Sequence, residues 1–150
     1  MAIIRKATQS DSLSIIDFQT KMAWETESLK LDLKTLTHGV NSVFLNPSKG
    51  QYFVAEDSGK IIASLLITYE WSDWRNTSIW WIQSVYVTSE FRRKGIFRSM
   101  FTFIKEEAGK NKVAGLRLYV ELNNIRAQKT YKSLGMNNEH YFMFEWLKDQ

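Results

Sequence analysis

The sequence predicts one domain of the α/β (α+β) class, in which helices flank both faces of a mixed, mostly antiparallel central sheet. Three observations lead to this class. Helical periodicity fills much of the first 45 residues, three strand-like runs follow with no helix between them, and helix and strand then alternate to the end. The resulting order is β-α-α-β-β-β-α-β-α-β. Since the chain has no repeat, no Pro/Ser-rich linker and a single proline, Pro47, we expect residues 1–150 to form one domain.

The spacing of the apolar residues distinguishes helices from strands. Leu36, Val40 and Val43 recur every three or four residues, as on one face of a helix, whereas residues 61–67 form a nearly continuous apolar run typical of a buried strand. Thr8 and Ser10 are suitable N-cap residues for the first helix, with Asp11 in its first turn. Gly135 follows the last helix as a suitable C′ residue. The expected helices are 10–24, 33–45, 96–108 and 124–134, and the expected strands are 3–4, 52–55, 61–67, 79–87, 116–120 and 141–147.

The composition excludes several classes of protein. The chain has no cysteine, which excludes disulfides, cysteine-based metal sites and a thiol nucleophile. The two histidines, His38 and His140, lack nearby partners, so we expect no metal site. No apolar run is long enough to span a bilayer, and the first residues lack the order of a signal peptide. We therefore expect a cytoplasmic protein with no membrane partner.

A basic turn lies between the strand that ends at residue 87 and the next helix. The net charge of the chain is only +4, yet Arg92, Arg93, Lys94 and Arg98 fall within seven positions. Gly95 allows close backbone approach where the helix begins, and the N–H groups of a first helical turn attract phosphate. Several cationic side chains favour a pyrophosphate over one carboxylate, although such a run is also compatible with a solvated loop. Neither a Walker loop nor a dinucleotide fingerprint is present.

With this turn the chain resembles the GNAT superfamily of acetyl-CoA-dependent N-acetyltransferases. The pyrophosphate loop of that family is [RQ]-x-x-G-x-[GA], which residues 92–96 fit, while Phe97 departs from the final small residue. The opening stretch with Thr8 and Asp11 is also in its usual place, so the resemblance covers essentially the whole chain. The second half of the family pattern, N-x-x-A-x-x-x-Y-x-x-x-G-[FM], is matched by Asn124, Ala127, Tyr131, Gly135 and Met136.

The resemblance implies a GNAT fold and transfer of acetyl from acetyl-CoA to a primary amine by direct attack in a ternary complex. It implies that the third and fourth strands splay apart, that Asn124 hydrogen-bonds the pantetheine arm, and that Tyr131 protonates the departing thiolate. By spacing alone, Tyr131 is instead a core tyrosine. The implied residues that bind acetyl-CoA are Val85, Val87, Arg92, Arg93, Lys94, Gly95, Ile96, Phe97, Arg98, Asn124 and Tyr131.

The sequence does not identify the general base. Many relatives carry a glutamate on the strand before the loop, but residues 79–84 contain no acid, and Gln83 cannot take a proton at neutral pH. Glu70, Glu25 and Glu27 are the alternatives, acting directly or through a water, and each is also compatible with an ordinary surface carboxylate. By elimination we expect Glu27 and Glu70 to converge on the amine, with pKa values raised by partial desolvation beside aromatic rings.

Two segments combine tryptophans with carboxylates where the family builds its acceptor pocket. They are residues 24–27 and 70–74, and this combination suits a cationic amine through cation–π contacts and charge pairing. Trp80 and Trp81 are expected in the core instead. The expected catalytic residues are Tyr131, Glu70 and Glu27, and the expected substrate-binding residues are Trp24, Glu27, Glu70, Trp71, Trp74 and Gln83.

Two other functions compete with acetyl transfer. The missing strand glutamate and Phe97 favour a non-catalytic acyl-CoA-binding GNAT-like protein. Nucleic-acid binding is disfavoured because the basic cluster is confined to one loop. The sequence leaves open whether the acceptor is a small-molecule or a peptide amine. It also leaves open the oligomeric state, for which a homodimer is one option.

Overall fold

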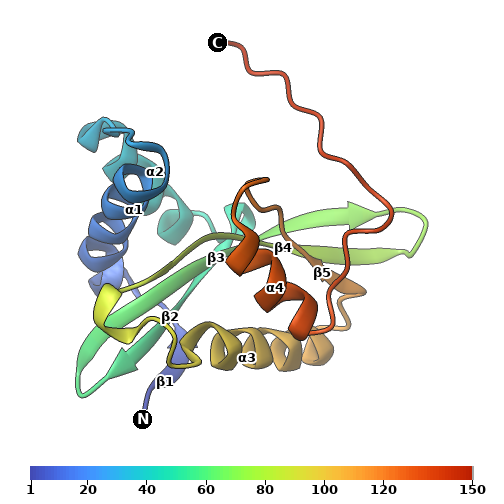
Figure 1. The fold of residues 1–150 in the computed structure, drawn as a ribbon, viewed down its shortest axis with the longest axis horizontal. Helices are drawn as coiled ribbons and strands as arrows, with labels where there is room; N and C mark the ends of the chain where they lie inside the picture. The colour runs from blue at the N-terminus through green and yellow to red at the C-terminus, as the bar shows by residue number, and fades with distance from the viewer. Residues whose placement is uncertain (150) are drawn as a thin grey trace. The chain divides into compact units, whose positions relative to one another are not determined.

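The computed structural model describes residues 1–149, in which five strands form one sheet in the order β1-β2-β3-β4-β5 (Figure 1). The pairs from β1 to β4 are antiparallel, and β5 pairs with β4 in parallel. The expected mixed, mostly antiparallel sheet is therefore confirmed. The strands are β1 (Ile3–Lys6), β2 (Gln51–Asp57), β3 (Lys60–Ser72), β4 (Thr77–Val87) and β5 (Gly115–Arg117). The helices are α1 (Ser12–Glu27), α2 (Leu33–Leu45), α3 (Ile96–Lys110) and α4 (Ile125–Ser133), with short 3₁₀ helices η1 (Gln9–Asp11), η2 (Pro47–Lys49) and η3 (Ser89–Phe91).

The chain forms two compact units. Met1–Arg117 contains the sheet and helices α1 to α3, and Leu118–Gln150 contains α4. In the first unit, successive residues of β2 point to opposite faces of the sheet. Tyr52 stacks on Phe44 of α2, with 5.6 Å between ring centroids, whereas Phe53 meets Phe103 of α3 edge-on at 6.0 Å. Helices therefore cover both faces, as expected, with α1 and α2 on one face and α3 on the other.

The last expected strand is absent, which corrects the predicted element order. Residues 141–147 have no regular secondary structure, and the side chains of Phe142, Phe144 and Trp146 are exposed. The preceding strand is also shorter than expected, because β5 covers three residues. A strand requires a neighbouring backbone to pair with, and none of residues 1–149 pairs with this segment. An apolar, aromatic pattern was therefore insufficient to predict a strand here.

A charge network fixes the connection between β1 and α1. Arg5 makes ion pairs of 2.8 Å with Asp11 and with Glu56 of β2, and Asp11 also accepts the backbone N–H of Thr8 at 2.8 Å. Thr8 and Asp11 thus form a capping box around η1, which leads directly into α1. Asp11 is only 6% exposed, and its hydrogen bond to Arg5 is the main reason why its pKa lies below the ordinary value of 3.8.

We expect Asp11→Ala to lower the free energy of unfolding by about 2 kcal/mol at neutral pH, because charge-assisted hydrogen bonds of a buried carboxylate are lost. Since the folded-state pKa of Asp11 is lowered, its contribution is complete above the unfolded-state pKa and disappears as the pH falls through the folded-state value. Urea unfolding at about pH 7 and about pH 2 measures both effects. Asp17→Ala is the control, since its ion pair with Lys21 is exposed. Equal losses in the two variants would contradict a special role for Asp11.

Candidate functional site

The basic turn joins β4 to α3 through two residues in left-handed backbone conformations. Arg93 has φ 63° and Gly95, the N-cap of α3, has φ 78°. The first bond of the helix runs from the Ser99 N–H to the Gly95 carbonyl at 3.0 Å. The N–H groups before Ser99 therefore have no acceptor inside the helix. Together with the positive end of the α3 dipole, they form a backbone site suited to an anion.

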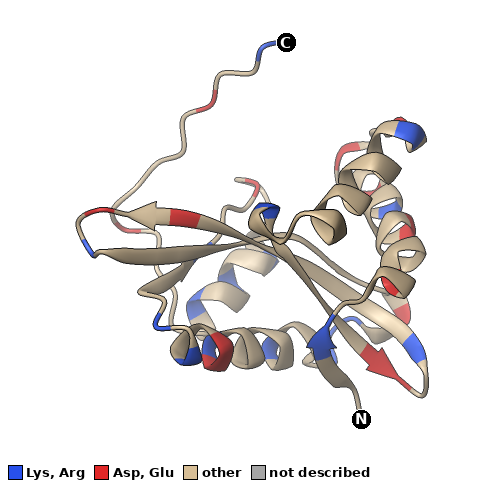
Figure 2. Cartoon of the chain, turned by 180° about the vertical axis from the view of Figure 1, so that it is seen from behind, with Lys and Arg blue, Asp and Glu red and all other residues tan. Residues whose placement is uncertain are grey.

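The side chains of this turn differ in their exposure and in the groups that they contact. Arg93, Lys94 and Arg98 are exposed, and the Lys94 ammonium lies 5.3 Å from the ring centroid of Phe91. Phe97 is half-buried and lies 6.2 Å, centroid to centroid, from Phe101 on the same helix. The bulky residue at the position of the family's small residue therefore packs along α3. Elsewhere in the first unit, basic and acidic residues are interspersed along the helices (Figure 2).

A bulge interrupts β4 just before the turn. Ser64 of β3 lies opposite Tyr86, but Leu66 lies opposite Gln83, so Ser84 and Val85 together face one residue. Ser84 has φ 53°, a left-handed conformation that a non-glycine residue adopts at some cost. Its carbonyl also accepts a 3.4 Å hydrogen bond from the side chain of Gln19 on α1.

Beyond this bulge, one edge of β4 is open. The partner β5 pairs only with Ile79–Trp81, and no other strand in residues 1–149 pairs with this edge. The Thr88 N–H donates to the Ile62 carbonyl at 2.9 Å, so the alternation of an antiparallel ladder turns the N–H and C=O of Val87 away from β3. The Val87 carbonyl accepts the Nε–H of Arg92 at 2.8 Å. The Val87 N–H faces the open edge, where an extended ligand can pair with it.

Glu70 does not have the environment that the sequence predicted. Its carboxylate accepts the indole N–H of Trp81 at 2.7 Å and forms a 2.8 Å ion pair with Arg117. The Trp81 hydrogen bond first, and Arg117 next, hold the pKa of Glu70 below its ordinary value. The expected rise in this pKa is therefore wrong, because strand neighbours supply donors that stabilise the charged form.

A row of polar side chains follows β3 and β4 on one face. Gln83 donates to the Thr68 hydroxyl at 2.6 Å, and Thr68 lies two residues before Glu70. Leu66, at the same alternation, packs against the core beneath α1 and α2. The polar row therefore lies on the α1/α2 face of the sheet. Trp80, at the opposite alternation, is buried as expected.

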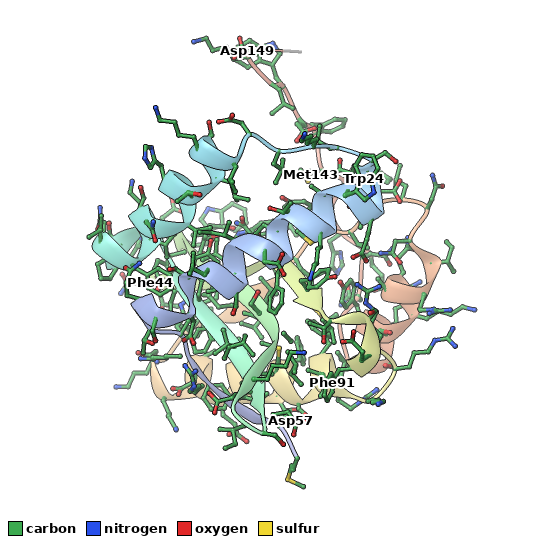
Figure 3. All side chains as sticks on the ribbon, turned by 90° about the vertical axis from the view of Figure 1, so that its left-hand side faces the viewer. Trp24, Phe44, Asp57, Phe91, Met143 and Asp149 are labelled. Atoms are coloured by element: carbon green, nitrogen blue, oxygen red, sulfur yellow. The ribbon has the colours of Figure 1, made fainter. Side chains whose placement is uncertain are left out.

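The other expected acceptor residues lie on exposed ends of their elements. Trp24, labelled in Figure 3, is 62% exposed near the end of α1, and Glu27 is its last residue. Trp74 is 91% exposed in the turn between β3 and β4. Seven residues of β4 separate that turn from the bulge at Ser84, a distance of roughly 25 Å along the strand. Within residues 1–149, the hydrogen-bond partners of the Glu70 carboxylate are Trp81 of β4 and Arg117 of β5, and neither belongs to the helix that carries Glu27.

One cluster was not expected from the sequence. Glu25, considered there only as an alternative base, bridges Tyr86 and Arg92 at 2.7 Å each. The Tyr86 hydroxyl, and then Arg92, lower the pKa of Glu25, while burial and Glu25 raise the pKa of Tyr86 to about 12. These partners lie 61 and 67 residues from Glu25 in sequence, so no local pattern indicates the contacts.

The second unit explains the spacing of the Asn-Ala-Tyr-Gly pattern. Asn124 is the N-cap of α4, and its Oδ1 accepts the Ala127 N–H at 3.1 Å, which leaves Nδ2 as its donor group. The helix ends at Ser133 with Leu134 as its C-cap; Gly135 follows with φ 92°, and the Met136 N–H donates to the Tyr131 carbonyl at 3.1 Å. Gly135 is therefore the C′ residue, as expected. Tyr131 is half-buried, and burial raises the pKa of its hydroxyl.

The described residues contain neither a candidate metal site nor a candidate membrane span. Across residues 1–149, no three His, Asp or Glu side chains gather in a way that would hold a metal ion. None of the described helices has both the length and the hydropathy needed to cross a membrane.

The fold is that of the acetyltransferase (GNAT) family, whose profile matches residues 12–136. The chain belongs to this family. It is similar to a possible acetyltransferase from Clostridium difficile 630, with 44% identity and a TM-score of 0.91 over 100% of this chain and 99% of that one. A predicted acetyltransferase from Clostridium acetobutylicum, solved with acetyl-CoA, shares the fold at 20% identity, with a TM-score of 0.76 over 97% of this chain and 96% of that one. Glucosamine-6-phosphate N-acetyltransferase from Arabidopsis thaliana shares it at 20% identity, with a TM-score of 0.75 over 99% of each chain. The chain has no significant match among proteins with a curated description.

Proposed function

We propose that this protein transfers an acetyl group from acetyl-CoA to a primary amine by direct attack in a ternary complex. The proposal rests on three structural features that follow one another along the chain. They are the open edge of the bulged strand β4, the basic turn with its two left-handed residues, and the start of α3. The open edge suits an extended chain that carries amide groups, and the turn suits a pyrophosphate. Acetyl-CoA combines both features in one molecule.

The binding roles follow from the chemistry of each group. Arg93, Lys94 and Arg98 neutralise the pyrophosphate, while the N–H groups from Gly95 to Phe97 donate to its oxygens. The backbones of Val85 and Val87 pair with the pantetheine arm. Asn124 uses Nδ2 toward a carbonyl of that arm, because its Oδ1 caps α4.

Aminolysis of a thioester needs a neutral amine and a proton for the departing thiolate. Tyr131 supplies that proton. Its raised pKa means that the hydroxyl remains protonated at neutral pH, so it is a donor when the C–S bond breaks. This role for Tyr131 rests on its register in the family pattern.

We propose that Glu27 and Glu70 serve the acceptor amine, with Gln83 and Trp24 beside it. Trp71 follows Glu70 directly in β3 and pairs with Ser78, so its side chain points to the opposite face of the sheet. Because the pKa of Glu70 is lowered, it is ionised at neutral pH and attracts an ammonium group more readily than it removes a proton. Glu27, at the exposed end of α1, is then the stronger candidate for the base, directly or through a water.

The position of Trp74 distinguishes two classes of acceptor. Its turn lies roughly 25 Å along β4 from the bulge, which is beyond the reach of a small amine held at the thioester. If Trp74 takes part, the acceptor is a peptide that extends along the β3–β4 hairpin. Trp74→Ala should then lower turnover of peptide amines and leave that of small amines unchanged.

The second candidate function is acyl-CoA binding without catalysis. Two observations favour it: residues 79–84 lack an acid, and Glu70 is already engaged by Trp81 and Arg117. The two functions differ in one measurement, the consumption of acetyl-CoA with a broad panel of amines, polyamines, amino acids and peptides. Acetylation of any member of the panel supports the transferase. Tight CoA binding with no acetylation across the panel supports the binding protein.

For the acceptor site, we expect Glu27→Gln or Glu70→Gln to depress turnover most at low pH, where the amine is mostly protonated and needs a base. The loss for the true base should reach roughly 100-fold. A pH–rate profile with an accepted amine measures it, and Glu106→Gln, an exposed change on α3, is the control. If both variants follow the wild type at every pH, another residue or a water-mediated route removes the proton.

A further inference from the structure

The first arginine of the basic turn is committed to contacts within the protein. One Nη of Arg92 lies 2.7 Å from Glu25 of α1, its Nε donates to the Val87 carbonyl at 2.8 Å, and its guanidinium carbon lies 5.2 Å from the ring centroid of Tyr86. The other oxygen of Glu25 accepts the Tyr86 hydroxyl at 2.7 Å. We call these three side chains, Glu25, Tyr86 and Arg92, the Glu25 clamp.

The clamp is attached to a rigid base. Tyr86 is only 6% exposed and stacks on Phe18 of α1, with 5.2 Å between centroids and 29° between planes. It therefore joins α1, the bulged part of β4 and the basic turn at one point. The lowered pKa of Glu25 and the raised pKa of Tyr86 mean that the carboxylate is charged and the phenol protonated at neutral pH. Both bonds of Glu25 are thus present under ordinary assay conditions.

Arg92 and its neighbours in the turn have different surroundings. Arg93 and Lys94 are exposed, and no ion pair holds either of them within residues 1–149. Arg92 instead directs two of its nitrogen atoms to Glu25 and to Val87. A bidentate, planar guanidinium suits such an anchoring role, because it fixes direction as well as charge. The turn therefore has one cation that holds it in place and others that are available to a ligand.

We propose that Glu25 is a positioning residue of the acetyl-CoA site: acting through Arg92, it holds the basic turn in the conformation that receives a pyrophosphate. This inference rests on the proposed function. It reassigns Arg92 from a phosphate contact to a support of the turn, and it gives Glu25 a role other than that of a base. The phosphate contacts are left to Arg93, Lys94 and the first turn of α3.

A purely electrostatic role and a positioning role for Glu25 predict opposite effects of Glu25→Gln on CoA binding. Glu25→Gln removes a negative charge close to an anion site, so electrostatics alone would tighten the binding of CoA. If Glu25 positions the turn, the same change weakens binding, because a neutral amide holds Arg92 less firmly. Arg92→Lys keeps the charge but loses the Nε bond to Val87, so electrostatics alone predicts no change.

The test is calorimetric titration of CoA and of S-acetylpantetheine, which lacks phosphates, into wild type and variants. We expect Glu25→Gln and Arg92→Lys each to weaken CoA binding roughly tenfold and to leave S-acetylpantetheine binding unchanged. Asp17→Asn is the matched control, since it removes a carboxylate of α1 that pairs with Lys21 instead. CoA binding by this control should stay within about twofold of the wild type or become slightly tighter.

Two results would overturn the inference, and they are distinguishable. If the wild type binds CoA and Glu25→Gln binds it equally or more tightly, Glu25 does not position the turn, while the proposed function stands. If the wild type itself does not bind CoA, the proposed function and the role of the clamp both fail. Melting temperatures of all variants separate a loss of ligand affinity from a loss of folding, since Glu25 and Arg92 are both exposed.

Discussion

Gly95→Asp is expected to abolish CoA binding while the protein remains folded. Gly95 has φ 78°, and a Cβ added there meets no atom within 4 Å, so the fold has room for the side chain. Aspartate tolerates a left-handed backbone better than most residues, although any side chain at this φ is strained. The free protein should therefore lose about 1 kcal/mol of stability and remain folded. A bound pyrophosphate, however, would face a carboxylate at about 5 Å, a repulsion of about 3 kcal/mol per charge pair at an effective dielectric constant near 20.

Gly95→Asn is the control for this prediction, because asparagine has the shape of aspartate without its charge. We expect Asn to weaken CoA binding about tenfold or less and Asp to weaken it at least about 100-fold. Calorimetry measures the affinity, and thermal unfolding checks that each variant is folded. Unchanged CoA affinity in a folded Gly95→Asp protein would show that the pyrophosphate does not bind at this turn.

The parts of the fold that follow from short-range patterns could be predicted from the sequence. The apolar spacing over 33–45 coincides with α2, Leu33–Leu45, because helical periodicity is local. The end of the last helix was marked by Gly135, a residue suited to a positive φ. The end of α1 was not marked by a glycine in the sequence. The helix stops before Ser28, which adopts φ 51° although it is not a glycine. The helix therefore continues to Glu27, three residues beyond its expected end.

The parts that depend on distant contacts could not be predicted. Arg117 lies 47 residues from Glu70, so the sequence showed the aromatic neighbours of that carboxylate but not the cation that lowers its pKa. The bulge at Ser84 has no glycine to mark it. The strand expected over 141–147 failed for the related reason that pairing depends on a second strand.

The same distinction between short-range patterns and distant contacts applies to the candidate site. The basic turn and the Asn-Ala-Tyr-Gly pattern are contiguous motifs, and the sequence located both. The Glu25 clamp joins α1 to the turn across 67 residues and was found only in the structure. The motifs of the proposed acetyl-CoA site are therefore easier to find in the sequence than the contacts between distant segments.

Tyr131→Phe is expected to lower the rate of acetyl transfer by roughly 100- to 10,000-fold, the usual contribution of a general acid. The change keeps the ring and removes only the hydroxyl, so the packing of α4 and the affinity for acetyl-CoA should change little. Tyr52→Phe is the control, because Tyr52 is a core tyrosine, 5% exposed and stacked on Phe44 of α2. Its loss of a hydroxyl should affect stability and not turnover.

The measurement is the single-turnover rate with an accepted amine at saturating acetyl-CoA, where chemistry limits the rate. Because burial raises the pKa of Tyr131, its hydroxyl is protonated in the wild type up to and above neutral pH, and the defect should be constant across that range. A rate near that of the wild type would leave Tyr131 as a packing residue. The thiolate would then take its proton from water or from the ammonium formed when the amine attacks.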